Sequence, residues 1–192
     1  KEKSFLLIID GSSLLSTQFY GNLPREILFA KTQEEKEKYY HKIMQTSKGV
    51  YTNAVYGFFR TLLRIVKEQK PSHLVVTWDI SRDTFRRKLY PAYKAQRSET
   101  MLPLKEQFVL CQNALESVGI CQLMDEEYEA DDFSGTVASM FEEEIPVRIL
   151  TKDNDYLQLV TEKTHLWLMH STAKKTEELF AKYKLDPKVV RC

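Results

Sequence analysis

Carboxylate side chains crowd together at one place in this chain. The stretch EYEADDFSG (128–136) puts Glu129, Asp131 and Asp132 within four consecutive positions. Two like charges about 4 Å apart repel each other by about 4 kcal/mol at an effective dielectric constant of about 20. Capping a helix needs only one of these carboxylates. A cluster of this kind is tolerated when a cation neutralises it, so the stretch predicts a divalent metal site.

Further acids follow the apolar runs of the sequence. FLLII ends at Asp10, HLVVTW ends at Asp79, and VRILT is followed by Asp153 and Asp155. A single Asp after a strand is more often a turn or helix-capping residue than a ligand. In a parallel sheet, however, the carboxyl ends of the strands meet at one edge, where functional groups gather. The predicted metal ligands are Asp10, Asp79, Glu129, Asp131, Asp132, Asp153 and Asp155.

The ligand type indicates which metal would bind. The three cysteines form no CxxC pair and the four histidines form no HxxxH pattern, so oxygen must hold the metal. Carboxylates suit Mg²⁺, with Mn²⁺ as a substitute. Seven acids exceed what one Mg²⁺ ion needs, which favours two ions and in-line phosphodiester hydrolysis. Glu129 and Asp132 are expected on one helix face and Asp131 on another, so the three would not all bind the same ion.

The segment 80–100 is strongly basic, although the net charge of the whole chain is only +1. Between Arg82 and Arg97 there are six basic residues and one acid, Asp83. Cations can neutralise phosphates while aromatic rings stack on bases, a combination typical of single-strand binding. A solvated charged loop is the plain alternative. The predicted nucleic-acid contacts are Phe85, Arg86, Arg87, Tyr93, Lys94 and Arg97.

Other familiar sites have no pattern in this sequence. It contains no GxGxxG, no Walker A motif and no GxSxG, which argues against dinucleotide binding, P-loop chemistry and serine hydrolysis. IIDGSS is similar to the start of an aspartyl-phosphate phosphatase. Ser12 stands where such an enzyme has its second acid, so the general acid is missing.

Alternating strands and helices predict the fold class. The expected strands are 5–9, 73–78, 120–124, 147–151 and 164–169. The expected helices are one that begins at Ser12 or Ser13, then 31–46, 52–70, 103–119, 130–143, 155–160 and 174–183. The segment 80–100 has no clean period and contains Pro91, so we expect a loop or a mobile arch there. The order predicts an α/β fold with a mostly parallel central sheet and helices on both faces, in one domain over 1–192.

Composition narrows the cellular setting. Apolar residues make up 43% of the chain, which is ordinary for a globular protein. No apolar run approaches the roughly 18 residues that a membrane span needs, and we expect no signal peptide and no membrane partner. The odd number of cysteines fits a reducing compartment. We therefore expect a cytoplasmic protein, and a monomer.

Six segments together resemble a known family. They are LLIIDGSSLL, TNAVYGFFRTLL, PSHLVVTWD, TFRRKLYPAYKAQR, EYEADDFSGT and LTKDNDYLQLV, between Ser4 and Val160. In order and spacing they resemble the 5′→3′ exonuclease domain attached to bacterial DNA polymerase I, together with free-standing bacterial and phage exonucleases and flap endonucleases. The resemblance implies a resolvase-like, PIN-like fold and a role in DNA replication or repair. It also implies cleavage of DNA at 5′ ends and flaps by a two-metal-ion mechanism, with RNA in hybrids as a further substrate.

The resemblance also implies roles for single residues. All seven acids match the metal ligands of the family, with Asp10, Asp79, Glu129 and Asp131 at a first ion. Asp132, Asp153 and Asp155 would then hold or orient a second. Lys94 in YKAQR matches a catalytic basic residue that reaches the scissile phosphate, with Arg86 and Tyr93 beside it. The stretch 80–100 matches the arch that threads or clamps a single-stranded 5′ end.

The sequence departs from the family pattern in two ways. Residues 21–50 are longer and more charged than in the polymerase-attached form and look more like the free-standing enzymes. No stretch corresponds to the family's GDxSDNxPG-like segment, with its two further acids, or to its helix-three-turn-helix region. Two alternatives therefore stay open: a PIN-like ribonuclease, and a nucleic-acid-binding protein that keeps the fold without catalysis.

Overall fold

The structure, a computed structural model, describes residues 4–96 and 98–169. The chain divides into two compact units. The first, which we call the sheet unit, takes in Lys1–Leu14, Pro71–Gln96 and Ile120–Cys192. The second, the helical unit, takes in Leu15–Lys70 and Arg97–Gly119. Each unit is described by itself below, and the single domain expected over 1–192 stays a prediction.

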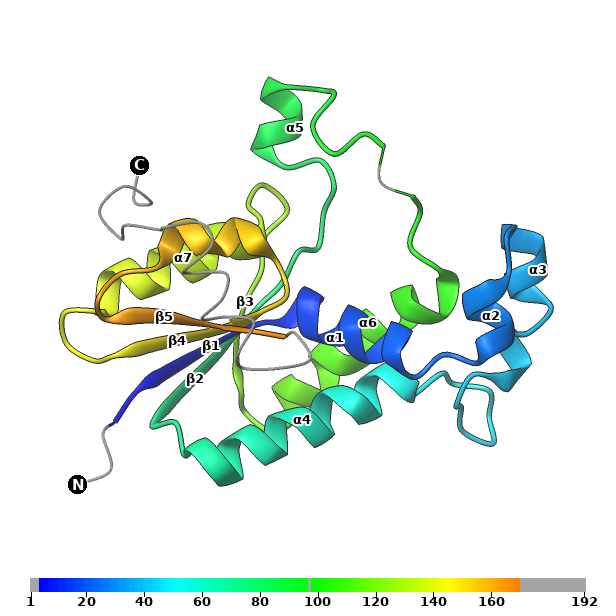
Figure 1. Ribbon diagram of the computed structural model, residues 1–192, viewed down its shortest axis with the longest axis horizontal. Coiled ribbons are helices and arrows are strands. Elements are labelled where there is room, and N and C mark those ends of the chain that lie inside the picture. Colours follow the sequence, from blue (N-terminus) through cyan, green and yellow to red (C-terminus); the bar gives the residue numbers. More distant parts are fainter. Residues whose placement is uncertain (1–3, 97, 170–192) are drawn as a thin grey trace. The chain divides into compact units, whose positions relative to one another are not determined.

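The sheet unit is built on five parallel strands (Figure 1). They are β1 (Leu6–Asp10), β2 (His73–Thr77), β3 (Cys121–Leu123), β4 (Val147–Thr151) and β5 (Thr164–Leu168). Their order in the sheet is β3-β2-β1-β4-β5. This confirms the predicted α/β fold with a parallel sheet and, within a residue or two, all five predicted strands.

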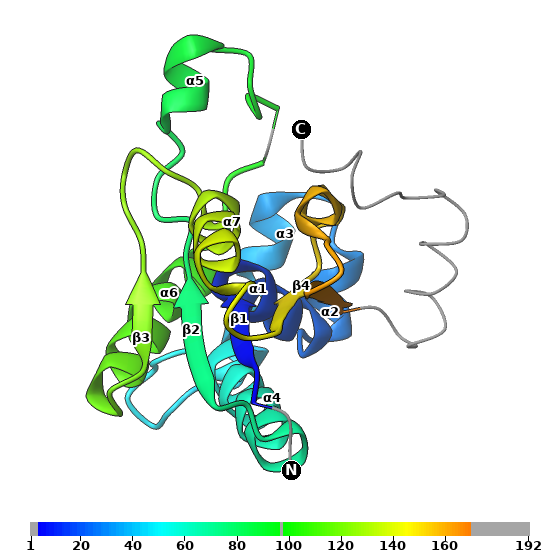
Figure 2. The ribbon, with the colours of Figure 1, turned by 90° about the vertical axis from the view of Figure 1, so that its left-hand side faces the viewer.

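The strand order places a switch point beside β1. The chain runs outward from β1 through β2 to β3, then returns to the other side of β1 with β4 and β5. In such sheets the crevice at the carboxyl ends of the two diverging strands is where ligands bind. Figure 2 shows the arrowheads of β2 and β3 pointing toward the end of this unit where α5 (Phe85–Leu89) lies. Asp10 and Thr151, the last residues of β1 and β4, lie at this switch point.

The sheet unit has a dense apolar core. All five residues of β1 are buried, the pattern of a central strand. Helix α7 (Ala130–Phe141) packs against β1, β2 and β4, and the 3₁₀ helix η2 (Asn154–Leu159) contacts both α7 and β5. The buried cluster comprises Leu6, Ile8, Val75, Ala138, Val147, Ile149, Tyr156, Val160, Leu166 and Leu168. These contacts hold the N-terminus of α7 at the carboxyl edge of the sheet.

The helical unit contains α2 (Arg25–Phe29), α3 (Gln33–Glu37), the 3₁₀ helix η1 (Tyr40–Lys42), α4 (Asn53–Gln69) and α6 (Leu102–Ser117). A buried Gln107 side chain joins α6 to the start of α4. Its Oε1 accepts hydrogen bonds from the amides of Ala54 at 2.7 Å and Val55 at 3.2 Å, and its Nε2 donates to Asn53 Oδ1 at 2.8 Å. These bonds satisfy backbone donors that the first turn of a helix otherwise leaves unpaired.

Helix α1 (Gly11–Gly21) begins directly after β1, one residue before the predicted start. A Cβ atom at Gly11 would lie 2.8 Å from the Trp78 ring and 2.8 Å from Val76, closer than real Cβ atoms come. Only glycine fits there, and it lets the chain turn from strand to helix without a linker. The helix is capped by Asp10, whose Oδ1 accepts a hydrogen bond from the Ser13 amide at 3.1 Å, and not by a serine.

Two predictions of secondary structure were wrong. The single helix expected over 31–46 is instead α3 and η1, because Thr32 and Glu35 form a capping box that starts α3, and Ile43 is extended. The arch expected to be a loop contains the five-residue helix α5. The helix expected at 174–183 lies outside the described residues. Within 4–96 and 98–169, no helix is both long enough and apolar enough to cross a membrane.

Candidate active site

Asp10 is the most deeply placed of the predicted ligands. It is 4% exposed, and its Oδ2 accepts a hydrogen bond from Thr151 Oγ1 at 2.7 Å. Burial raises the pKa of Asp10 to about 6, and the nearby charge of Asp79 adds to the rise. Asp10 is therefore held in an environment that disfavours the ionised form of its carboxyl group.

Asp79 follows β2 and ties that strand to α7. Its Oδ1 accepts a hydrogen bond from the amide of Ala130 at 2.7 Å, and its own amide donates to Ser12 Oγ at 2.9 Å. Ala130 is the first residue of α7, so the bond places the acid at the positive end of the helix. The ends of β1 and β2 and the start of α7 are thus held together.

Glu129 is the N-cap of α7 and has an extended backbone, with φ −94° and ψ 163°. It is 6% exposed, and its amide donates to Asp132 Oδ2 at 3.0 Å. Glu129 and Asp132 therefore lie side by side as expected, although Glu129 precedes the first helical turn. The two acids are brought together by capping.

Asp131 lies in the first turn of α7. Burial raises its pKa, and the charges of Asp132, Glu129 and Asp79 raise it further. Its Oδ1 atom is buried and has no hydrogen-bond partner. A buried carboxylate oxygen without a donor is costly unless a cation or water satisfies it.

Basic side chains of the arch segment (residues 80–96) contact these acids. Arg86 makes a bidentate ion pair with Asp132, with both N–O distances at 2.6 Å. Lys94 Nζ lies 2.7 Å from Glu129 Oε2, and the Tyr93 hydroxyl donates to the same oxygen at 3.2 Å. The buried Thr84 hydroxyl donates to the other oxygen of Glu129 at 3.3 Å.

These pairs shift the pKa values of their members. The bond from Arg86 holds the pKa of Asp132 below its usual range, although burial acts in the opposite direction. Hydrogen bonding to Asp132 raises the pKa of Arg86. Burial lowers the pKa of Lys94, but the bonds to Glu129 and Tyr93 outweigh burial and raise it overall. These directions keep Asp132, Arg86 and Lys94 charged at neutral pH.

Asp153 and Asp155 lie in the turn after β4. The Asp155 amide donates to Asp153 Oδ1 at 2.9 Å, and the Asp153 amide donates to Thr151 Oγ1 at 3.1 Å. Thr151 therefore connects this turn to Asp10. Asp153 is partly buried and Asp155 is exposed. Both interact locally here, so their predicted role as ligands stays a prediction.

We call Asp10, Asp79, Glu129, Asp131 and Asp132 the acid cluster. Charge repulsion links Asp79 to both Asp10 and Asp131, so the ends of two strands and one helix do converge. Among the described residues, no three His, Cys, Asp or Glu side chains form a ready-made metal site. The donor chemistry still fits a hard divalent cation: all donors are carboxylate oxygens, and the buried Asp131 Oδ1 lacks a partner.

A groove of about 530 Å³ lies beside the cluster. Arg86, Asp131 and Asp132 line one part, and Thr136 of α7 and Gln158 of η2 line another. The groove thus opens onto both members of the Arg86–Asp132 ion pair. Carboxylates, a guanidinium and neutral polar groups are all within reach of a bound molecule.

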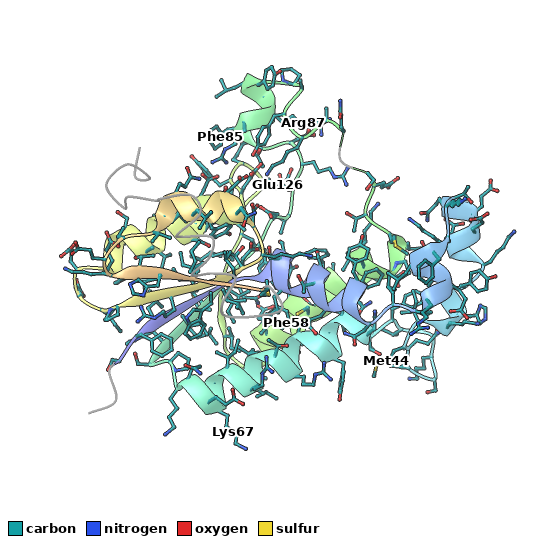
Figure 3. All side chains as sticks on the ribbon, in the orientation of Figure 1. Met44, Phe58, Lys67, Phe85, Arg87 and Glu126 are labelled. Carbon is teal, nitrogen blue, oxygen red and sulfur yellow. The ribbon has the colours of Figure 1, made fainter. Side chains whose placement is uncertain are left out.

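The predicted nucleic-acid contacts lie mainly on α5 and the turn after it. Figure 3 labels Phe85 and Arg87 on α5, and Glu126 in the loop that precedes α7. Phe85 packs against Tyr128 with ring centroids 5.7 Å apart, and Arg87 pairs with Asp83 at 3.6 Å. Arg86 stands 4.7 Å from the Phe85 ring centroid and Lys94 stands 4.8 Å from that of Tyr93. Arg97 lies outside the described residues.

Sequence reasoning missed the hydroxyl groups that support the acids. Thr151 and Thr84 donate to acid-cluster carboxylates, and Ser12 accepts from the Asp79 amide. Beneath them, the Thr77 and Ser134 hydroxyls form a buried hydrogen bond of 2.9 Å. The position of Thr151 was the one hint in the sequence, because it ends a strand that is followed by acids. Spacing alone does not distinguish a threonine that supports a carboxylate from an ordinary strand residue.

Comparison with known sequences identifies relatives. The family described as 5′-3′ exonuclease, N-terminal resolvase-like domain, matches residues 5–184. A 5′-3′ exonuclease of Bacillus subtilis is 34% identical over 164 residues, which cover 85% of this chain and 50% of the relative. One from Aquifex aeolicus is 33% identical over 187 residues, covering 96% of this chain and 58% of the relative. DNA polymerase I of Bacillus subtilis is 34% identical over 164 residues, which are 16% of its length.

Solved structures share the fold. The D15 protein of bacteriophage T5, co-crystallised with metal ions, matches 95% of this chain and 62% of its own with a TM-score of 0.66 and 16% identity. The T5 D15 flap endonuclease in a pseudo-enzyme-product complex with DNA and metal ions gives a TM-score of 0.58 and 17% identity, with the same coverage. Given the match over residues 5–184, this chain belongs to the family of 5′-3′ exonuclease N-terminal, resolvase-like domains.

Proposed function

We propose that the chain is the catalytic domain of a metal-dependent 5′→3′ exonuclease or flap endonuclease that hydrolyses phosphodiester bonds in DNA. The observation that carries the proposal is the direct contact between the acid cluster and the cationic arch segment. Lys94 and Arg86 lie within 2.7 Å of Glu129 and Asp132 at the start of α7, so a phosphate bound by these cations would lie beside the acids. The 5′→3′ polarity is inferred from the family.

The acids would bind the divalent cations. Asp10, Asp79, Glu129 and Asp131 would hold one Mg²⁺ or Mn²⁺ ion. Asp132, Asp153 and Asp155 would hold or orient a second. When bound, such cations polarise phosphoryl oxygens and supply a nucleophile at neutral pH.

The arch segment would bind the substrate. Arg86 and Lys94 would contact phosphate oxygens through charged hydrogen bonds, which are stronger than neutral ones. Phe85 and Tyr93 each stand beside one of these cations, so an unpaired base could stack on a ring while its phosphate meets the neighbouring charge. A single-stranded 5′ end or flap, or the RNA strand of a hybrid, offers unpaired bases of this kind.

A cleavage assay tests this proposal. The chain would be incubated with a 5′-flap DNA carrying an internal label, with an RNA–DNA hybrid and with single-stranded RNA, each with Mg²⁺, with Mn²⁺ and with a chelator. We expect metal-dependent cleavage near the 5′ end of the DNA. Preference for single-stranded RNA would instead support a PIN-like ribonuclease, and binding without cleavage would support a non-catalytic protein.

Matched variants separate chemistry from binding. Asp131→Asn should lower the cleavage rate by about 10²–10³, the usual effect of removing one group that stabilises charge in the transition state. Glu126→Gln makes the same acid-to-amide change at an exposed loop position outside the acid cluster and should cleave normally. Equal rates for both variants would contradict the assignment of the acid cluster.

A further inference from the structure

Cations of the arch segment hold both oxygens of Asp132 and one oxygen of Glu129. Arg86 bonds both oxygens of Asp132, and the Glu129 amide shares one of them. The two oxygens of Glu129 accept from Thr84 on one side and from Lys94 and Tyr93 on the other. In this arrangement Asp132 cannot offer either oxygen to a divalent cation without competing with Arg86, and Glu129 cannot offer Oε2 without competing with Lys94.

Asp131 behaves differently from these two acids. Its buried Oδ1 has no hydrogen-bond partner. The neighbouring side chains of Asp132 and Glu129 are acceptors themselves and cannot donate to it. Arg86 and Lys94 therefore neutralise part of the cluster and leave one oxygen unsatisfied.

The backbone of the arch segment has an unusual conformation at Lys94. Lys94 has φ +53°, in the left-handed region that a non-glycine residue rarely adopts. Its side chain is 29% exposed, and that of its partner Glu129 is 8% exposed. The other end of the segment has separate anchors: the Phe85 amide donates to the Glu127 carbonyl at 3.0 Å, and Lys88 pairs with Glu127.

We propose that Arg86 and Lys94 act as built-in counter-ions of the acid cluster and compete with a divalent cation for Glu129 and Asp132. Binding of the cation would release the guanidinium and the ammonium group, which then become available for phosphate. Cation binding and nucleic-acid capture would be coupled through this exchange, and the coupling must be reciprocal. The inference rests on the proposed function, because it takes the acid cluster to be the cation site.

The competition can be measured without nucleic acid. Mn²⁺ would be titrated calorimetrically into the metal-free chain and into Lys94→Met and Arg86→Gln. Partly exposed ion pairs typically shift an equilibrium by about two- to fivefold, so each variant should bind Mn²⁺ tighter by about that factor. If Arg86 and Lys94 served only to contact phosphate, replacing them would leave the affinity for Mn²⁺ unchanged in this experiment.

Lys88→Met is the matched control. It removes the same charge from the same segment, but its partner Glu127 lies outside the acid cluster. Both members of this pair are about half exposed, so solvent and salt screen them, and the affinity for Mn²⁺ should stay close to that of the unchanged chain. If Lys88→Met and Lys94→Met increased the affinity for Mn²⁺ equally, the loss of one positive charge anywhere on the segment would explain the effect. That result would overturn the proposal.

A second measurement uses the unchanged chain and does not depend on any variant folding. The amides of Tyr93 and Ala95 donate to Tyr90 and Ala92 within the arch segment. Hydrogen exchange at these amides should speed up when Mn²⁺ saturates the cluster, while the Phe85 amide stays protected. Unchanged or slower exchange at Tyr93 and Ala95 would overturn the counter-ion exchange.

The outcomes distinguish this inference from the proposed function. If the unchanged chain binds no Mn²⁺, the cation site itself is wrong and both proposals fall. If it binds Mn²⁺ and the Lys94 and Arg86 variants bind no tighter, only the counter-ion exchange is overturned. Tighter binding in these two variants together with faster exchange at Tyr93 and Ala95 would support the inference.

Discussion

Single carboxylates in this protein are held where their charge is unfavourable. Asp10 is almost fully buried at the end of β1, and Asp131 has an oxygen without a donor. Their pKa values are raised mainly by burial. A residue that only capped a helix would be placed at the surface, where it keeps its charge without this cost.

Asp10 should make the chain less stable as the pH rises. The unfolded carboxyl loses its proton near its ordinary pKa of 3.8, and the folded one near about 6. The folded chain therefore binds more protons between these values, and the free energy of unfolding falls as the pH increases through this window. Without metal, Asp10→Asn should be more stable than the unchanged chain at pH 8 by about 1–3 kcal/mol, and the gain should shrink below pH 5.

Urea unfolding in a chelator at pH 4.5 and at pH 8 measures this difference. Glu126→Gln serves as the control, because it makes the same chemical change at an exposed position. A stability difference between Asp10→Asn and the unchanged chain that does not vary with pH would contradict the raised pKa.

At the scale of elements, the site depends on how strand ends and helix starts are joined. Gly11 lets α1 begin immediately after β1, and Asp79 receives a hydrogen bond from the first amide of α7. Thr151 joins the ends of β1 and β4 by donating to Asp10 and accepting from the Asp153 amide. The acids are therefore positioned by the backbone and by hydroxyl groups around it.

Thr151→Val should weaken this junction. Valine has the same shape but no hydroxyl, so a buried carboxylate oxygen of Asp10 would lose its donor, at a cost of about 1–3 kcal/mol. We expect a lower free energy of unfolding at pH 8 and weaker Mn²⁺ binding, measured by urea unfolding and calorimetry. Thr151→Ser keeps the hydroxyl and should restore most of both quantities; failure of serine to do so would indicate a packing role alone.

The helical unit offers an independent test at the same scale. Gln107→Ala should lower the free energy of unfolding by about 1–3 kcal/mol, because the buried Ala54 amide and Asn53 Oδ1 lose their Gln107 partner. Urea unfolding measures the loss. Glu106→Ala, at the neighbouring exposed position of α6, should change stability by no more than about 0.5 kcal/mol. Similar losses in both variants would argue against the capping role.

At the scale of the whole molecule, opposite charges are nearly balanced in number. The chain has 28 basic and 27 acidic residues, and its net charge is +1. Acids gather at the carboxyl ends of the strands, and the arch segment faces them with Arg86 and Lys94. A divalent cation would relieve the repulsion that remains within the acid cluster, so its binding should be visible as stability of the whole chain.

Millimolar Mg²⁺ or Mn²⁺ should therefore raise the melting temperature. A ligand that binds only the folded state adds about 2.7 kcal/mol at 100 times its Kd. For a chain of this size that corresponds to a rise of roughly 5–11 °C. Asp131→Asn should show a much smaller rise, while Glu126→Gln should respond like the unchanged chain. Thermal unfolding followed by circular dichroism measures this, and no response to divalent ions in the unchanged chain would contradict a cation site.

The sequence was sufficient for the features that depend on local pattern. Apolar runs of strand length and amphipathic helices of period 3.6 predicted all five strands and helices α4, α6 and α7, because hydrophobic periodicity is set by which face is buried. Acids at strand ends predicted where the acid cluster would form, because parallel strands share one carboxyl edge. The broken helix at 31–46 and the short helix α5 were missed, since capping and tertiary contacts outweigh weak local propensity there.

Only the tertiary structure decided which groups touch which. The pairing of Arg86 with Asp132 joins residues 46 positions apart, and the bond from Thr151 to Asp10 spans 141. No local pattern encodes such partners, because they depend on strand order and on how α5 docks against the loop before α7. Glu129 and Asp132 illustrate the difference: the sequence placed both acids at the start of a helix. The folded chain made Glu129 the cap, paired it with Lys94, and placed Arg86 against Asp132 and within 3.8 Å of Glu129.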